Sequence, residues 1–63
     1  MLCENVKKIR KKKGISQDKL AKLADVTHTT LVKIEAGVND NPTIKTMKKI
    51  AHALDVTVND LIR

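Results

Sequence analysis

Aromatic side chains are missing from this chain of 63 residues, which also contains only one cysteine and one proline. Proteins that bind single-stranded nucleic acids stack bases on aromatic rings, so the lack of Phe, Tyr and Trp argues against that class. A single cysteine cannot form an internal disulfide, which excludes a stapled secreted scaffold and favours a reducing cytoplasm. No apolar run reaches the ~18 residues of a membrane span, and a signal peptide's apolar segment is also missing. We therefore expect a soluble cytoplasmic protein.

Residues that carry catalysis or bind metals are also scarce. Cys3, His28 and His52 show no zinc-ligand spacing, and a site built on them would need a fourth ligand. Ser16 is the only serine and has no flanking glycines to form a nucleophile elbow, and no glycine-rich phosphate loop is present. The sequence therefore predicts no catalytic residue, no metal, no cofactor and no small-molecule substrate. We expect a protein that is not an enzyme.

Positive charge, in contrast, is abundant. Thirteen Lys and Arg residues against seven Asp and Glu residues give a formal net charge of +6, and six of the basic residues lie within residues 7–13. This excess favours a polyanionic partner, and without aromatic residues duplex DNA fits better than RNA. The basic run has two interpretations, a solvated helix end or a surface that adds sequence-independent attraction to a duplex.

Apolar spacing predicts five helices and no strand, in a single all-α domain over residues 1–63. Gly14 should end the first helix, whose apolar positions recur at helical spacing, and Thr43 should begin the fourth. The short last helix has an acid three residues after Thr57, as in a capping box. The expected helices are 2–13, 17–24, 28–36, 44–54 and 58–62. The fourth is expected to bury Met47, Ile50, Ala51 and Leu54.

Residues 16–37 contain two of these helices on either side of a short break. Ser16 can cap the first and Thr27 the second, and Gly37 supplies the left-handed residue that commonly ends a helix. The small Ala21 allows close approach of the two helices, and Val26 fills the corner with apolar surface. This pattern predicts a helix-turn-helix. The residues expected to face inward are Leu20, Ala21, Ala24, Leu31 and Ile34.

The order and spacing of several segments resemble the Cro/repressor-type (XRE-like) helix-turn-helix regulators of phages and bacteria. The resemblance covers nearly the whole chain. It implies a compact five-helix, lambda-repressor-like fold with the motif at the second and third helices. It also implies a transcriptional regulator that binds double-stranded DNA sequence-specifically and represses by blocking polymerase. The matching segments are Ile15-Ser16-Gln17, Leu20-Ala21, Ile34-Glu35-Ala36-Gly37, Asn41-Pro42-Thr43 and Ile50-Ala51-His52-Ala53-Leu54-Asp55-Val56.

In such motifs the second helix enters the major groove with its N-terminal residues at the base edges. The family's base-reading positions fall on Thr27, His28, Thr29 and Lys33, and the outward Val32 can touch a thymine methyl. Lys33 can donate to guanine O6 and N7. Simpler alternatives stand beside these roles, since Thr27 is explained by capping and His28 and Lys33 by solvated positions.

Phosphate contacts are expected near helix N-termini, where free amides favour an anion. Gln17 resembles the family's backbone clamp, its side-chain amide donating to a phosphate, and Lys45 stands at the start of the fourth helix. Asn39 and Asn41 are neutral donors in the preceding loop. Many relatives have a basic loop there, whereas this one carries Asp40 and no cation, so we expect the loop to contribute less affinity.

Two pairs of positions bear on stability. Arg10 and Glu35 match a pair that, in phage repressors of this type, forms a partly buried ion pair between the first and third helices. Asp25 and Asp55 stand where the family usually has glycine, because the backbone there tends to be left-handed. Aspartate tolerates that conformation better than most residues, so we expect left-handed backbone at both.

Two other functions remain open. The domain can be a protein-interaction module, such as an antitoxin-like or adaptor domain with secondary DNA contact. The first helix can also lie on an anionic membrane surface, since Val6 and Ile9 oppose lysines, although its narrow apolar face favours core packing.

The resemblance further implies a symmetric homodimer on half-sites about 34 Å apart. Its expected surface is residues 56–63. The chain can be either a complete Cro-like protein or the reading domain of a longer one.

Overall fold

The computed structural model describes residues 2–62, which form five helices. No strand occurs within that range, as expected. Three helices end one residue earlier than the sequence indicated, and the other two have the expected bounds. The helices are α1 (Leu2–Lys12), α2 (Gln17–Ala24), α3 (His28–Glu35), α4 (Ile44–Ala53) and α5 (Val58–Ile62).

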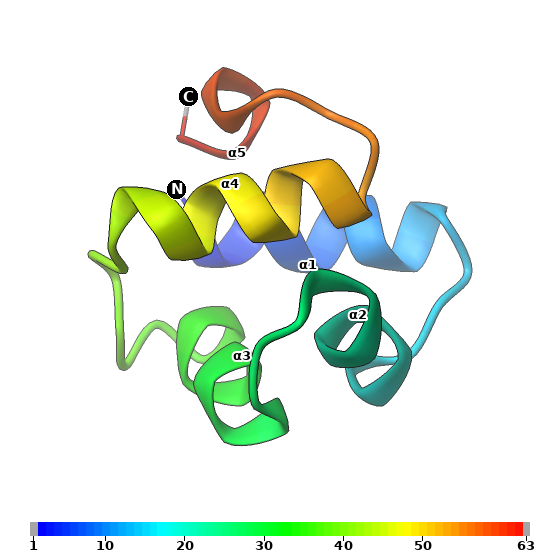
Figure 1. The fold of residues 1–63 in the computed structure, drawn as a ribbon, viewed down its shortest axis with the longest axis horizontal. Helices are drawn as coiled ribbons and strands as arrows, with labels where there is room; N and C mark the ends of the chain where they lie inside the picture. Colours follow the sequence, from blue (N-terminus) through cyan, green and yellow to red (C-terminus); the bar gives the residue numbers. More distant parts are fainter. Residues whose placement is uncertain (1, 63) are drawn as a thin grey trace.

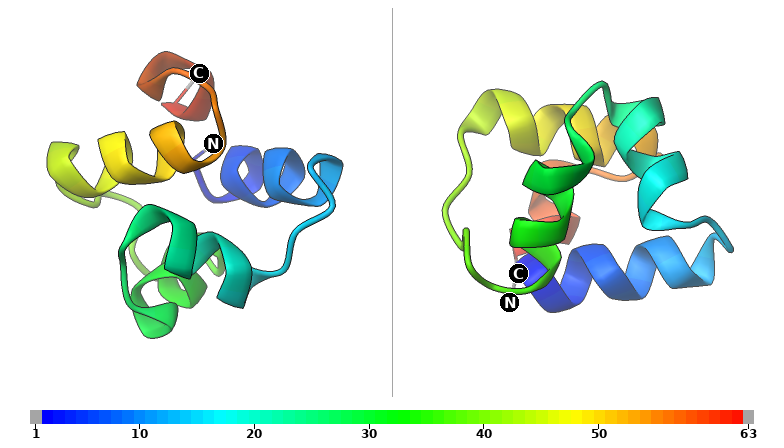
Figure 2. Two further views of the ribbon diagram at one scale, coloured as in Figure 1. Left: turned by 45° about the vertical axis from the view of Figure 1, so that its right-hand side comes forward. Right: turned by 90° about the horizontal axis from the view of Figure 1, so that it is seen from below.

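The helices enclose one aliphatic core. In Figure 1, α1 and α4 cross the middle of the molecule, with α2 and α3 on one side and α5 on the other. Helix α1 packs against α3 and α5, α4 packs against α2 and α5, and α2 packs against α3. Seen from below, α3 lies between α1 and α4 with α2 beside it (Figure 2). The side chains that are fully buried are Val6, Leu20, Leu31, Ile34, Ile50, Leu54 and Leu61.

Hydroxyl side chains begin four of the five helices. Ser16, Thr27 and Thr43 each accept a hydrogen bond from the backbone N–H three residues later, which satisfies a free donor of the first turn. Before α5 the bonding is reciprocal. Thr57 Oγ1 accepts from the N–H of Asp60 at 3.1 Å, and Asp60 Oδ2 accepts from the N–H of Thr57 at 3.0 Å. This confirms the predicted capping box.

Two helices end at aspartates in left-handed backbone, as expected. Asp25 has φ 56° after α2, and Asp55 has φ 58° after α4. After Asp25 the N–H of Val26 donates to the carbonyl of Ala21 at 3.0 Å, and the equivalent bond after Asp55 is 2.9 Å. In each case an N–H donates to the carbonyl five positions earlier in the chain. Such bonds satisfy free carbonyls at a helix end, as in a Schellman motif.

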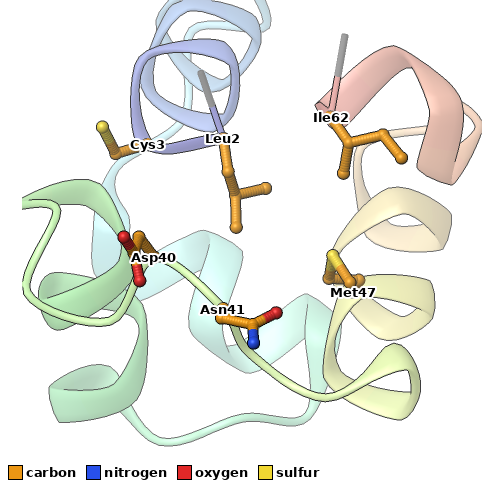
Figure 3. A pocket seen from close by; sticks show the side chains of 6 residues that line it. All are labelled: Leu2, Cys3, Asp40, Asn41, Met47 and Ile62. Atoms are coloured by element: carbon orange, nitrogen blue, oxygen red, sulfur yellow. The ribbon is translucent and has the colours of Figure 1, made fainter.

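One expected core residue is less buried than predicted. Met47 is half-buried, whereas Ile50, Ala51 and Leu54 of the same helix are buried. Met47 lies near the start of α4, where it lines a pocket of about 250 Å³ between the first residues of α1 and the last residues of α5 (Figure 3). Helix α1 begins and α5 ends at this pocket, so neither helix covers the thioether of Met47.

The apolar stripe of α1 faces the core. Val6 is fully buried and Ile9 packs against the same cluster, so these residues offer no apolar face to a membrane surface. Among the helices formed by residues 2–62, none combines the length and the apolar character needed to cross a bilayer. Core packing therefore accounts for the stripe, and the membrane-surface interpretation of α1 loses its support.

Replacing Asp55 with glycine should stabilise the fold by about 0.5 to 1 kcal/mol, because glycine adopts φ 58° without side-chain strain. Asp25→Gly should gain less, since it also removes a carboxylate that lies 3.8 Å from Lys49 Nζ. Thermal unfolding followed by circular dichroism measures both. Asp55→Ala is the matched control and should lower the melting temperature. Unchanged or lower melting temperatures in both glycine variants would contradict the prediction.

Candidate nucleic-acid interface

Helix α3 is amphipathic, with one arc packed inward and the other presented to solvent. Leu31 and Ile34 are fully buried, whereas His28, Thr29 and Lys33 are exposed. At 100° per residue these three exposed positions fall on one side of the helix. Val32 lies within the same arc but is half-buried, so less of it is available to a thymine methyl than a fully outward valine would offer.

Thr27 has a clear structural role at the start of α3. Its Oγ1 accepts from the N–H of Thr30 at 3.1 Å and donates to Thr30 Oγ1 at 2.7 Å. The capping explanation of this threonine is therefore present in the structure. Its hydroxyl is already engaged by Thr30, which leaves less of it for a base.

The predicted ion pair lies at the C-terminal end of α3. Arg10 Nε is 2.7 Å from Glu35 Oε2, and Arg10 Nη2 donates to Glu35 Oε1 at 3.0 Å, so the pair is bidentate. The side chains are 12% and 1% exposed, respectively. Arg10 Nη1 also donates to the carbonyl of Ile15 at 2.8 Å, just before α2. This confirms the interaction that the family resemblance implied and extends it to the connection between α1 and α2.

Gln17 occupies an unexpected position. Its Nε2 donates to Glu35 Oε1 at 3.1 Å, whereas the sequence assigned this amide to a phosphate. An amide nitrogen carries two N–H groups, so one remains for another acceptor. The contact joins residues 18 positions apart on different helices. No local sequence signal predicts it.

Three further residues were assigned to phosphates: Asn39 and Asn41 lie between α3 and α4, and Lys45 lies in α4. Asn39 is half-buried, and its N–H donates to the carbonyl of Lys33 at 3.1 Å, which places it against the end of α3. Asn41 also lines the pocket and lies between Asp40 and Met47 in Figure 3. Lys45 is exposed on the first turn of α4. Of the three, Asn39 is thus the residue whose backbone bond places it beside α3.

Most cations among residues 2–62 form no ion pair with an acid. Besides the Arg10 pair, the ion pairs within residues 2–62 are Lys22 with Asp18 at 3.4 Å and Lys49 with Asp25 at 3.8 Å. Lys33 and Lys45 form no ion pair within that range, which leaves both ammonium groups available to an anion. The five lysines of the basic run are exposed, and its arginine alone turns inward.

These elements, two short helices joined at a tight corner with a polar arc on the second, define a helix-turn-helix domain. The helix-turn-helix family model matches residues 6–61, and the chain belongs to this family. The match and the relatives below confirm the Cro/repressor-type assignment made from the sequence.

Among curated proteins, the chain is similar to the HTH-type transcriptional regulator SinR of Bacillus subtilis, with 37% identity over 62 residues. That alignment covers 98% of this chain and 56% of SinR. The HTH-type transcriptional regulator SlrR of the same organism is 36% identical over 61 residues, covering 97% of this chain and 40% of SlrR. The chain therefore spans about half the length of these relatives, or less.

Two solved structures are similar throughout. The N-terminal DNA-binding domain of SinR from Bacillus subtilis has a TM-score of 0.96 and 36% identity, covering 100% of this chain and 91% of that one. The crystal structure of SinR, the master regulator for biofilm formation, in complex with DNA also has a TM-score of 0.96 and 36% identity, with 100% of both chains covered. These similarities confirm the five-helix fold.

Glu35→Ala should destabilise the domain by ~3 to 5 kcal/mol, because it leaves the guanidinium of Arg10 largely buried without a counter-charge. A loss of that size approaches the whole stability of a small domain, so the variant should be partly unfolded at 25 °C. Urea denaturation followed by circular dichroism measures the change.

The matched control for Glu35→Ala is Lys22→Ala, which removes an ion pair whose side chains are 76% and 65% exposed. It should change stability by about 0.5 kcal/mol or less. Glu35→Ala with the stability of the unaltered chain would show that the buried pair is not needed for folding.

Proposed function

We propose that this domain binds double-stranded DNA sequence-specifically as the reading domain of a transcriptional regulator, with α3 in the major groove. The observation that carries the proposal is the exposed polar arc of α3, with His28, Thr29 and Lys33 on one side of a helix whose other side is fixed in the core. A structure of the similar SinR in complex with DNA supports it. The family is a class of DNA-binding regulators and not of enzymes, which agrees with the scarcity of catalytic residue types.

Base recognition would come from His28 and Thr29 at the start of α3 and from Lys33 in its last turn. Lys33 can donate to guanine O6 and N7, and Thr29 can bond to a base edge or touch a thymine methyl. His28 can donate to or accept from a base or a phosphate. Val32 and Thr27 remain candidates with smaller contributions, because one is half-buried and the other uses its hydroxyl for capping.

Phosphate contacts would hold α3 in register without reading sequence. Gln17 and Lys45 lie in the first turns of α2 and α4, where free amides and the positive end of the helix dipole favour an anion. Asn39 and Asn41 would add neutral donors, with Asn39 the better placed of the two. The formal charge of +6 would draw the domain to any duplex before these contacts form.

We further propose a symmetric homodimer on two half-sites, acting as a cytoplasmic repressor that blocks polymerase. Residues 56–63 are the proposed dimer surface, of which Arg63 lies outside the described residues. Leu61 is buried and Val58 packs against the core, so Ile62, 51% exposed, is the apolar side chain available to a partner. A two-fold dimer would set two copies of α3 about 34 Å apart.

Selection of bound sequences from a random duplex pool should return a defined site. Lys33→Ala should lose ~1 to 3 kcal/mol at particular base pairs, because it removes a base contact, whereas Gln17→Ala should weaken binding to all sequences alike. Binding isotherms on the selected site and its single-base variants separate the two effects.

The matched control for Lys33→Ala is Lys8→Ala, which removes an exposed lysine of α1 and should leave the preferred sequence unchanged. Equal loss on every duplex from Lys33→Ala would remove Lys33 from the base-reading set. Weak, salt-insensitive binding by the unaltered chain would instead favour a protein-interaction module.

Ile62→Asp should weaken dimer formation on a two-half-site duplex about tenfold or more, because a carboxylate replaces an apolar side chain at the proposed contact. Affinity for a single half-site should stay the same. Sedimentation equilibrium with each duplex measures both quantities. Leu23→Asp, at a side chain of similar exposure on α2, is the matched control and should leave the dimer fraction unchanged. Equal dimer fractions for Ile62→Asp and the unaltered chain would exclude this surface.

A further inference from the structure

The carboxylate of Glu35 connects the two helices of the motif directly. Glu35 is the last residue of α3, and its side chain is 1% exposed. Its Oε1 accepts from Gln17 Nε2 at 3.1 Å as well as from Arg10 Nη2 at 3.0 Å, while Oε2 accepts from Arg10 Nε. A buried acid on the reading helix thus holds the first side chain of α2.

This hydrogen bond restricts a side chain that is otherwise flexible. A free glutamine samples several rotamers, and ordering it on binding costs free energy. A bond to a charged acceptor is stronger than one between neutral groups, so the bond to Glu35 favours one rotamer of Gln17 in the free protein. Because the amide group is planar, fixing one of its N–H bonds also fixes the direction of the other.

The ion pair removes the obstacle that a carboxylate would present to a phosphate. An unpaired anion behind Gln17 would repel a DNA phosphate, but the bidentate guanidinium of Arg10 offsets that charge at hydrogen-bond distance. Arg10 also donates to the carbonyl of Ile15, which fixes the backbone that leads into α2. The pair can therefore orient Gln17 without making its surroundings negative.

We propose that Glu35 is a positioning residue for DNA binding: it holds the amide of Gln17 so that the second N–H is already directed at a phosphate on the α2 N-terminus. The inference rests on the proposed function. It adds that Glu35, which would not itself touch DNA, raises the affinity for DNA by orienting Gln17. Glu35 thereby has a second role, separable from its contribution to folding.

The test is a double-mutant cycle on duplex binding, with Glu35→Gln, Gln17→Ala and the double variant measured at one salt concentration. The temperature is kept well below the melting temperature of the least stable variant. Gln17→Ala should weaken binding about tenfold, the size expected for one hydrogen bond to a charged group. Glu35→Gln, whose neutral amide is a weaker acceptor, should weaken binding severalfold on its own. It should have less than about a twofold effect once Gln17→Ala is present.

A second cycle, with Lys45→Ala in place of Gln17→Ala, is the matched control. Lys45 is a proposed phosphate contact on another helix and has no bond to Glu35, so the two effects should multiply. Equal loss from Glu35→Gln in the presence and absence of Gln17→Ala would overturn the proposal, since Glu35 would then act through the fold alone.

A spectroscopic measurement covers the case in which Glu35→Gln does not fold. Gln17 is the only glutamine of the chain, so glutamine-selective ¹⁵N labelling gives one pair of side-chain amide signals. In the free, unaltered chain this amide should be as rigid as the backbone, and on DNA binding only one of its two protons should shift strongly. An amide that is mobile in the free protein would overturn the proposal.

The outcomes also separate this inference from the proposed function. If Lys33→Ala changes sequence preference while Gln17→Ala leaves affinity unchanged, the positioning role is wrong and DNA reading by α3 stands. If the unaltered chain binds no duplex, both are overturned, even where the Gln17 amide is rigid.

Discussion

A buried pair of opposite charges ties together the part of the molecule on which DNA reading would depend. Arg10 comes from α1, Glu35 from the end of α3, and their shared hydrogen bonds reach the carbonyl before α2 and the first side chain of α2. Taking both charges out of water is costly, so such a pair adds little net stability compared with apolar residues of the same volume. The pair instead fixes how α1 and α3 are oriented relative to each other. Aliphatic side chains can shift against one another, whereas a bidentate ion pair requires one geometry.

The ion pair matters more here because the apolar core does little else to fix how the helices pack. The fully buried apolar side chains of residues 2–62 are all Leu, Ile or Val, and the chain has no aromatic ring whose shape would fix the packing of its neighbours. Small domains bury a modest fraction of their surface and have little stability to spare. Helix caps and the ion pair therefore do more to determine where the helices begin and how they pack than they would in a domain of twice the length.

The sequence predicted what is encoded locally. Four of the five helices begin at a hydroxyl side chain whose capping bonds span three residues, and apolar residues recur at helical spacing. Helix bounds could therefore be predicted to within one residue. The ion pair between Arg10 and Glu35 was found only through family resemblance, since 25 positions separate the two residues.

Features that depend on how helices meet were not predictable in this way. The bond from Gln17 to Glu35 requires the relative placement of α2 and α3. The partial exposure of Met47 depends on where α1 begins and α5 ends, because both of these helix termini lie at the pocket. Asn41 was grouped with Asn39 because they are close in sequence. The N–H of Asn41 donates to Asn39 Oδ1 at 3.4 Å, yet Asn41 lines the pocket, whereas the N–H of Asn39 donates to the end of α3. Closeness in the sequence of a loop does not show which surface each side chain faces.

Some cations of the fold are paired with acids and others are not. This difference explains how general attraction to DNA and discrimination between base pairs can come from different residues. Acids are placed opposite particular cations at Arg10, Lys22 and Lys49, while the exposed lysines of α1 have none of these partners. Unpaired surface lysines attract any polyanion and cannot distinguish base pairs. In the proposed DNA complex, discrimination would therefore come from the few side chains of α3 whose direction is fixed by the packing of Leu31 and Ile34 behind them. The same packing that stabilises α3 would thus also determine which of its side chains are available to a base pair.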